Sequence, residues 1–380
     1  MKQALRARAA LAALLTILCS AALAEDVKEK PAATAGGGAT IAVLTFKNIS
    51  GDATLDWLGV GFAESLSTKL SNVSGIQLVE RTQLEKALKE LKLADTAIVE
   101  ASTAGKIGKV IGAKFVVVGS FQKAGESIKA DARRVEVETS VASSGVEATG
   151  KFDQVFDVQS DLAIKLVATF GKTVTEAEKQ VMAKPETTSV TAYELNAKGL
   201  KEGTAGSFDE ASSLYSKAIE ADPKYAEAYY NRGLIRFARQ DFTGAESDLN
   251  KAIELDPKDP MAYISRGICW IASMNLIKGM ADLNKAIEVA PNDYRGYGAR
   301  ALIYMNAGNA ILGLQDTNKV IKLNPKLPDA YFARAMCNLA LGNALTVEKD
   351  YKKGQELGGT PPPELTQMMM LMGVGDESEE

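Results

Sequence analysis

The sequence predicts an α/β domain, with a mixed sheet and flanking helices, followed by an all-α superhelix of repeated helical hairpins. Two observations predict this order. Short apolar runs alternate with helix-period segments early in the chain, which is typical of a sheet covered by helices. Later, one phrase ending in proline recurs every 34 residues, a period typical of stacked-repeat architectures. The four prolines are Pro223, Pro257, Pro291 and Pro325.

Residues 1–24 have the features of a secretory signal peptide. Basic residues precede an apolar run from Ala9 to Cys19, and Ala22 and Ala24 form a small-residue cleavage site. The alternative is an uncleaved anchor, but the apolar run is too short to span a bilayer, so we expect no transmembrane segment in the mature chain. Cleavage would change the net charge from −4 to −7, which argues against a nucleic-acid partner.

Residues 25–39 are charged and then rich in alanine and glycine, so we predict a flexible linker. The α/β domain is predicted over 40–184. Its strands are expected at 40–46, 75–80 and 114–120, and its first helices at 56–73, 81–91 and 99–111.

The spacing of apolar residues changes near the end of the α/β domain. A period-two pattern over 126–141 and 146–158, broken by Ser143, Ser144 and Gly145, predicts an antiparallel hairpin at the edge of the sheet. One long amphipathic helix is predicted from 161 to about 183. Residues 185–189 are the expected linker to the repeats.

The α/β domain resembles the CsgG-like family, known for the curli assembly and transport component. The resemblance rests on Ile-Ala-Val-Leu-Thr-Phe at 41–46, Leu-Val-Glu-Arg at 78–81 and Lys-Phe-Val-Val-Val-Gly-Ser at 114–120. It implies a Gram-negative cell envelope, in the periplasm and associated with the outer membrane. The hairpin departs from the pore-forming member, because Arg133, Arg134, Glu136 and Glu138 make it too charged for a membrane strand. We therefore expect this chain to share the fold and the location of the family, but not its secretion activity.

The 34-residue units fill residues 190–358, and the same type of residue recurs at several equivalent positions, or columns, of the units. A small residue recurs at Gly199, Gly233, Gly267, Ala301 and Ala335, and an aromatic residue recurs at Tyr229, Tyr263, Tyr297 and Tyr331. Apolar residues between the columns are three and four apart, which is the helix period. The pattern resembles tetratricopeptide repeats, with four full units and a degraded fifth in which Gly359 replaces the proline.

The first helix of each unit is expected to line a concave groove. The family's groove positions carry mostly apolar residues here, which is typical of a binding surface. They are Tyr193, Asn196, Tyr230, Leu234, Phe237, Ile264, Ile268, Ile271, Leu302, Met305, Phe332 and Met336. We predict that this groove binds a protein or peptide. The alternative is that the chain fills the groove itself, with the last helix of the α/β domain or with the methionine-rich segment at 368–372.

A second pair of columns predicts ion pairs between the two helices of each unit. An arginine precedes the small residue, and an aspartate follows 16 residues later, as expected for charge-assisted pairs. The pairs are Arg232 with Asp248, Arg266 with Asp282, Arg300 with Asp316, and Arg334 with Asp350. The alternative is a basic stripe for anionic ligands.

The sequence argues against an enzyme. It contains no histidine, which removes the commonest metal ligand and general base. The glycines of 105–112 lack phosphate-loop spacing. We predict no catalytic residues, no metal and no cofactor, and we expect Cys269 and Cys337 to be buried free thiols.

We therefore expect an exported, non-enzymatic adaptor or scaffold. Its CsgG-like domain would dock on an envelope assembly or self-associate, and its repeats would bind a protein partner. The alternative is an oligomeric structural or transport subunit of a curli-like secretion system or another outer-membrane assembly. Residues 359–380, which begin with three prolines and end in acidic residues, are predicted to be a disordered tail.

Overall fold

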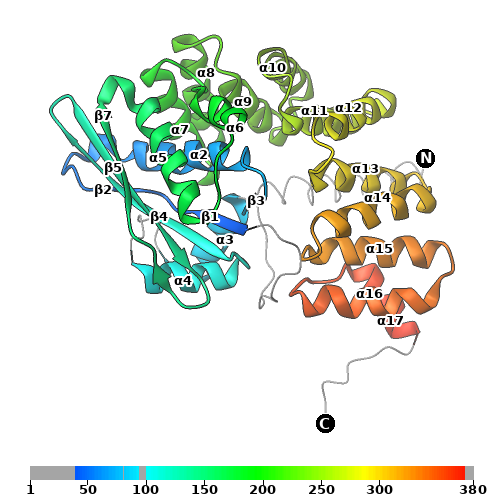
Figure 1. Cartoon of the computed structure of the whole chain (residues 1–380). Helices are drawn as coiled ribbons and strands as arrows, with labels where there is room; N and C mark the ends of the chain where they lie inside the picture. The colour runs from blue at the N-terminus through cyan, green and yellow to red at the C-terminus, as the bar shows by residue number, and fades with distance from the viewer. Residues whose placement is uncertain (1–38, 80, 94–99, 373–380) are drawn as a thin grey trace. The chain divides into compact units, whose positions relative to one another are not determined.

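The computed structural model describes residues 39–79, 81–93 and 100–372. The predicted signal peptide and almost all of the predicted linker at 25–39 therefore lie outside the described residues. The described chain forms two compact units, one ending at Leu255 and one starting at Asp256. The predicted division at 185–189 is thus not the boundary between them, for reasons given below. Figure 1 shows the elements of both units.

The first unit contains the predicted mixed sheet (Figure 1). In spatial order its main strands are β3 (Ile76–Leu78), β1 (Ala39–Val43), β4 (Phe115–Ala124), β5 (Ser127–Glu136) and β6 (Val141–Ala142). Two more strands complete it, β2 (Lys47–Asn48) beside β4 and β7 (Val146–Lys151) beside β5. β1 runs parallel to β3 and β4, whereas β5 is antiparallel to β4, β6 and β7. The period-two segments therefore form the predicted antiparallel strands at 127–136 and 146–151. The prediction was wrong for 152–158, which forms a 3-10 turn and the first turn of a helix that begins at Val155.

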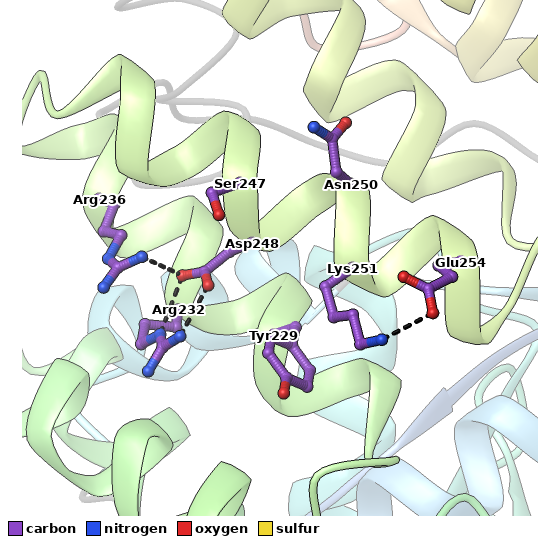
Figure 2. Close-up of a pocket in the computed structure, with 8 residues that line it drawn as sticks. All are labelled: Tyr229, Arg232, Arg236, Ser247, Asp248, Asn250, Lys251 and Glu254. Carbon is purple, nitrogen blue, oxygen red and sulfur yellow. Dashed lines mark hydrogen bonds and ion pairs between the residues drawn. The ribbon is translucent and has the colours of Figure 1, made fainter.

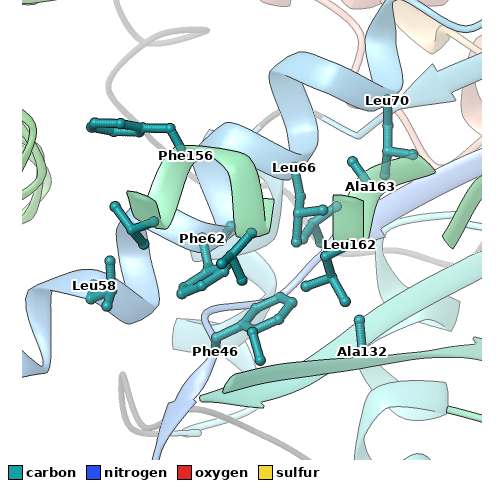
Figure 3. Packing of buried hydrophobic residues seen from close by; sticks show 14 of the residues in the cluster. Phe46, Leu58, Phe62, Leu66, Leu70, Ala132, Phe156, Leu162 and Ala163 are labelled. Atoms are coloured by element: carbon teal, nitrogen blue, oxygen red, sulfur yellow. The ribbon is translucent and has the colours of Figure 1, made fainter. Parts of the chain in front are cut away.

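Helices cover both faces of this sheet because successive strand side chains point to opposite faces. Val117 points to the face covered by α2 (Trp57–Ser71) and α5 (Val155–Thr169). Val116 belongs to the core on the other face, with residues of α3 (Arg81–Glu90) and α4 (Ala101–Val110). Figure 3 shows the larger core, in which Phe62 and Leu66 of α2 and Leu162 of α5 pack together above the sheet.

The predicted long helix over 161–183 was wrong. The segment forms α5 and a separate helix α6 (Glu176–Ala183). Gly171 has a φ of +69°, a conformation that favours glycine and ends the first helix. Thr175 then starts the second, because its hydroxyl and the Glu178 carboxylate form a capping box.

The repeats form the predicted helical hairpins with the predicted period. The first unit holds α7 (Val190–Thr204), α8 (Phe208–Ala221), α9 (Ala226–Ala238) and α10 (Phe242–Leu255). The second holds α11 (Pro260–Ala272), α12 (Leu276–Val289), α13 (Tyr294–Asn306), α14 (Ala310–Leu323), α15 (Pro328–Ala340) and α16 (Ala344–Glu356).

The prediction of a disordered tail over 359–380 was wrong for the part that the structure describes. Residues Pro363–Leu371 form helix α17. Its Leu365 and Met369 are buried in one cluster with Phe332 of α15 and Tyr351 of α16. The proline run and acidic composition suggested disorder, but two apolar residues at i, i+4 are enough to hold one short helix on the last hairpin. Residues 373–380 lie outside the described part.

Candidate partner-binding surface

The predicted groove positions fall into two groups in the structure. Five are buried: Tyr193, Asn196, Ile264, Ile271 and Phe332. Seven are half-buried: Tyr230, Leu234, Phe237, Ile268, Leu302, Met305 and Met336. Only the second group keeps side-chain surface that a partner can contact.

Tyr193 of the first hairpin is covered by the α/β domain. Its ring meets Trp57 of α2 and Phe156 of α5 edge to face, with centroids 5.9 and 5.2 Å apart. Its hydroxyl accepts a hydrogen bond of 2.8 Å from Nε2 of Gln159. A Cβ at Gly61 would lie only 2.7 Å from the hydroxyl oxygen, so a glycine is required there. The chain itself therefore covers Tyr193, but with residues of α2 and of the start of α5 and not with the segment 161–183 that the alternative prediction named.

Asn196 is committed to a buried polar network. Its Nδ2 donates to the hydroxyl of Tyr225 and to Oε1 of Glu227, each at 3.0 Å, and its Oδ1 accepts from Nδ2 of Asn231 at 3.1 Å. Burial, together with the carboxylates of Glu186 and Glu64, raises the pKa of Glu227 to about 8. The network therefore joins α7 to α9 and contains a carboxyl group that titrates near neutral pH.

The predicted linker at 185–189 is fixed to the repeats. Thr187 is buried and donates a 2.5 Å hydrogen bond to Oδ2 of Asp222, in the turn after α8. Ser189 caps α7 by accepting from the backbone N–H of Ala192. These bonds hold the linker on the first hairpin, and the contacts of Tyr193 with α2 and α5 join that hairpin to the α/β domain within one compact unit.

Sequence reasoning missed Lys69, which lies in the last turn of α2 and is 3 % exposed. Its Nζ donates to the carbonyls of Met182 at 2.7 Å and Lys184 at 3.4 Å, at the end of α6. Burial lowers the pKa of Lys69, against the opposing effect of the Glu186 carboxylate. The signal was present in the sequence, because Lys69 lies three residues after Leu66, where the helix period places an apolar residue.

In the first unit, the predicted groove positions that remain accessible lie on α9. Tyr230, Leu234 and Phe237 are half-buried and follow the spacing of one helix face. The Phe237 ring also packs against Phe242 of α10, with centroids 5.7 Å apart. This face is apolar and aromatic.

In the second unit, Ile268, Leu302 and Met336 occupy the same position of three successive first helices. All three are half-buried, and Met305 lies one turn after Leu302. We call these four residues the apolar ladder. Neighbouring groove positions are used for packing instead. Ile271 packs on Gly279 of α12, where an added Cβ would approach its Cγ1 to 2.4 Å, and Phe332 is covered in the cluster that contains α17.

Each predicted Arg–Asp pair is present and is bidentate. The Nε–Oδ2 distances are 2.9, 2.8, 2.8 and 2.8 Å, and the Nη2–Oδ1 distances are 2.7, 2.7, 2.8 and 2.6 Å, from the second hairpin to the fifth. Each guanidinium also lies over the tyrosine three residues earlier, 5.5 to 5.8 Å from its ring centroid. The hydrogen bonds with Asp316 raise the pKa of Arg300. The pairs tie the two helices of a hairpin together.

The same arginines also join neighbouring hairpins. The Nη1 group of Arg300 donates to Oδ1 of Asn284, on the second helix of the preceding hairpin, at 2.6 Å. Arg334 reaches Asn318 in the same way at 3.1 Å. Each of these arginines therefore connects three helices, which is a structural role.

A hollow of about 400 Å³ lies beside the first of these pairs and is lined by residues of α9 and α10. Figure 2 shows the side chains that line it. Arg232 and Arg236 both contact the carboxylate of Asp248, and Lys251 pairs with Glu254 at 2.7 Å. The cations drawn there thus have carboxylate partners. This favours the structural interpretation over a basic stripe for anionic ligands.

The predicted free cysteines are present. Cys269 and Cys337 are both buried, and neither forms a disulfide with another described residue. Burial raises the pKa of Cys337 to about 11. Within 39–79, 81–93 and 100–372, no group of three or more carboxylate or thiol side chains is arranged to hold a metal ion. Over the same ranges, no helix combines the length and the apolar composition needed to cross a membrane.

Comparison with known families identifies both modules. Residues 21–133 match the family described as curli production assembly/transport component CsgG. Residues 196–260 match the tetratricopeptide repeat. The chain is therefore a modular protein with a CsgG-like α/β domain followed by tetratricopeptide repeats.

Individual relatives cover only parts of the chain. A protein of Rhizobium meliloti (strain 1021) named putative adenylate cyclase 3 is 25% identical over 199 residues, which are 52% of this chain and 32% of that protein. The chain thus spans about a third of that relative.

Similar solved structures include MamA and YrrB, the latter described as a tetratricopeptide-repeat protein with an unusual peptide-binding site. MamA is 24% identical with a TM-score of 0.38, and the match covers 42% of this chain and 93% of MamA. YrrB is 17% identical with a TM-score of 0.38, and the match covers 52% of this chain and all of YrrB.

Proposed function

We propose that this chain is a non-enzymatic adaptor of the cell envelope, whose repeats bind a protein segment and whose CsgG-like domain docks on an outer-membrane or periplasmic assembly. The observation that carries the proposal is the apolar ladder. Ile268, Leu302 and Met336 stay half-buried at one position of three successive hairpins, although neighbouring positions such as Ile271 are buried.

A repeated apolar position on first helices suits an extended or helical protein segment, because each hairpin then contributes one contact. Methionine side chains at two of the four positions can adapt their shape to a partner. The usable surface is smaller than predicted, since the α/β domain covers Tyr193 and the polar network with α9 buries Asn196. Binding through this surface needs no catalytic group.

The envelope location is supported by the CsgG match and by the predicted signal peptide. The name of the Rhizobium relative raises a catalytic alternative, but the match covers only 32% of that protein. We therefore propose binding and not catalysis as the function of the chain.

The test is co-purification from the organism that makes the protein, followed by mass spectrometry. Ile268→Ser combined with Leu302→Ser should remove a specific partner, because both changes take apolar area from the ladder. Ile277→Ser is the matched control, since Ile277 lies on the same unit and is 85 % exposed. Loss of the partner in the control, or its retention in the double variant, would contradict the proposal.

A second candidate is an oligomeric structural or transport subunit. It is favoured by β7, which among the described strands pairs only with β5 and leaves its other edge unpaired. An unpaired edge can accept a strand from a neighbouring copy. A large uniform oligomer of the full chain, measured by light scattering, would support this candidate, and a monomer or dimer would exclude it.

A further inference from the structure

Exposed aliphatic residues recur at one position of the last three hairpins. Ile277, Ile311 and Leu345 are 34 residues apart, and each is the second residue of the second helix of its hairpin. They are 85, 61 and 96 % exposed. Asp209 and Thr243 hold the same position in the first two hairpins, so the repeat fold does not require an apolar residue there.

These residues lie where the first helix of each hairpin turns into the second. We call the three turns of the second unit the turn edge, which consists of residues 273–278, 307–312 and 341–346. Adjacent turns lie side by side, because Ile311 lines a hollow of about 420 Å³ together with Ala340 and Leu341 at the end of α15. Met274 and Leu276 add further apolar surface to the turn edge, at 72 and 47 % exposure.

The turn edge also differs in charge from the rest of the chain. Its sequence contains no carboxylate, although the chain holds 48 acidic residues and has a net charge of −4. Lys278 is its one charged residue. The equivalent turns of the first two hairpins carry Asp209, Glu210, Arg239 and Asp241. The turn edge is therefore suited to contact an anionic surface, which the carboxylates of the other turns would repel.

Aromatic residues lie at the base of these turns. Trp270 and Tyr304 hold equivalent positions near the ends of α11 and α13, and both are half-buried. The Nζ group of Lys278 lies 3.9 Å from the centroid of the Trp270 ring. The Trp270 carbonyl accepts a 2.7 Å hydrogen bond from the backbone N–H of Asn275, within the turn edge. Tryptophan and tyrosine combine an apolar ring with a polar atom, and they are enriched at the boundary between water and a bilayer.

We propose that the turn edge is a membrane-contact surface that binds a bilayer containing anionic phospholipid. The exposed aliphatic side chains enter the boundary of the acyl chains. Trp270 lies at the level of the headgroups, and Lys278 reaches a lipid phosphate. Separate projecting side chains suit this partner, because lipids close around each of them, whereas a protein partner would need a matching cavity for each.

The lipid contact is independent of the apolar ladder, because the residues that make it do not belong to the ladder. A protein partner on the ladder should therefore stay bound when the lipid contact is lost. Failure of one proposal thus leaves the other standing.

The test is co-sedimentation of the full chain with vesicles of phosphatidylcholine and phosphatidylglycerol. The wild-type chain should bind them. Ile311→Ser combined with Leu345→Ser should weaken binding by at least about tenfold, because two aliphatic side chains no longer enter the bilayer. The urea midpoint should stay unchanged, since both sites are exposed. Lys278→Glu should weaken binding to these vesicles more than binding to vesicles of phosphatidylcholine alone.

Val141→Ser is the matched control, because Val141 is also aliphatic and 62 % exposed but lies in β6 of the α/β domain. This variant should bind vesicles like the wild-type chain. A wild-type chain that does not bind vesicles, a double variant that binds like wild type, or a control that loses binding would each overturn the proposal. So would a wild-type chain that ignores vesicles and dimerises through the turn edge.

Tryptophan fluorescence gives a second measurement. The chain has two tryptophans, and Trp57 is buried in the core at 6 % exposure. Lipids brominated near the headgroup end of their acyl chains should therefore quench Trp270, and Trp270→Phe should abolish this quenching. Vesicle binding without quenching would place the contact elsewhere and overturn the proposal.

Discussion

Arg266 and Asp282 are joined by two parallel hydrogen bonds, Nε to Oδ2 at 2.8 Å and Nη2 to Oδ1 at 2.7 Å. The aspartate side chain is 10 % exposed, so the charge that it carries is largely removed from water. The pair links α11 to α12 in the first hairpin of the second unit. Its counterparts do the same in the neighbouring hairpins.

Replacing Arg266 by leucine should lower the free energy of unfolding by roughly 2–3 kcal/mol, because it leaves a nearly buried carboxylate unpaired. The measurement is the urea midpoint of the full chain. The double variant Arg266→Leu with Asp282→Leu should be more stable than the single variant, since it removes both charges. A double variant whose loss equals or exceeds that of Arg266→Leu would show that the pair is not what stabilises the hairpin.

Helix α17 gives a prediction about the tail. Leu365→Ala should destabilise the second unit by roughly 2–3 kcal/mol, because Leu365 is 1 % exposed in the last cluster and its removal leaves a cavity. Leu371→Ala is the matched control, with the same chemical change at a 76 % exposed site, and should change stability by less than about 0.5 kcal/mol. Equal effects of the two changes, measured by urea unfolding, would mean that α17 does not pack as described.

The first two hairpins should be needed by the α/β domain. A chain of residues 39–184 would expose Trp57 and Phe156 by removing Tyr193, and it would leave Lys69 near a frayed segment. It should therefore melt at a lower temperature than a chain of residues 39–255, or aggregate. The comparison is thermal unfolding followed by circular dichroism. Equal melting temperatures would place the boundary back at 185–189.

Glu227 should make stability depend on pH. Its pKa is raised from the ordinary 4.5 to about 8 in the folded chain, so the folded state holds a proton that the unfolded state has released between these values. The contribution of Glu227 to the free energy of unfolding is therefore greatest near and below pH 4.5 and falls as the pH rises toward 8. Its slope is at most about 1.4 kcal/mol per pH unit, and above about pH 8 the contribution no longer changes.

The measurement is the urea midpoint at pH 5.5 and pH 7.5. Glu227→Gln keeps an acceptor for Asn196 and removes the ionisable group, so its midpoint should fall less than that of wild type over this interval. Glu186 and Glu64 face the same network, and burial also raises the pKa of Glu186, so the variant should keep part of the pH dependence. A variant with the wild-type pH dependence would show that another group is responsible.

Much of the fold could be predicted from the sequence because its signals are local and repeated. Four proline-ended phrases fix the hairpin period, and arginine and aspartate columns fix which helices pair. Strands β1, β3 and β4 could be predicted from short apolar runs. The bond of Lys69 to the end of α6 also left a local signal, a lysine in an apolar stripe, although it was missed.

The rest depends on contacts between segments far apart in the chain. Tyr193 occupies a groove position by sequence, but whether it faces solvent or α5 is decided by how the α/β domain packs on the first hairpin. The same holds for Phe332, which α17 covers. For both residues, the sequence predicted the position within the repeat, but it could not predict which distant element would cover the side chain.

The most direct test of the adaptor proposal is photo-crosslinking in the organism that makes the protein. A crosslinkable residue would be placed at Ile268, at Leu302 and, as the control, at Ile277. The account predicts the same discrete heavier band from Ile268 and Leu302, containing one other protein, and no such band from Ile277. No band from either ladder position, or the same band from all three positions, would contradict a partner bound on the ladder.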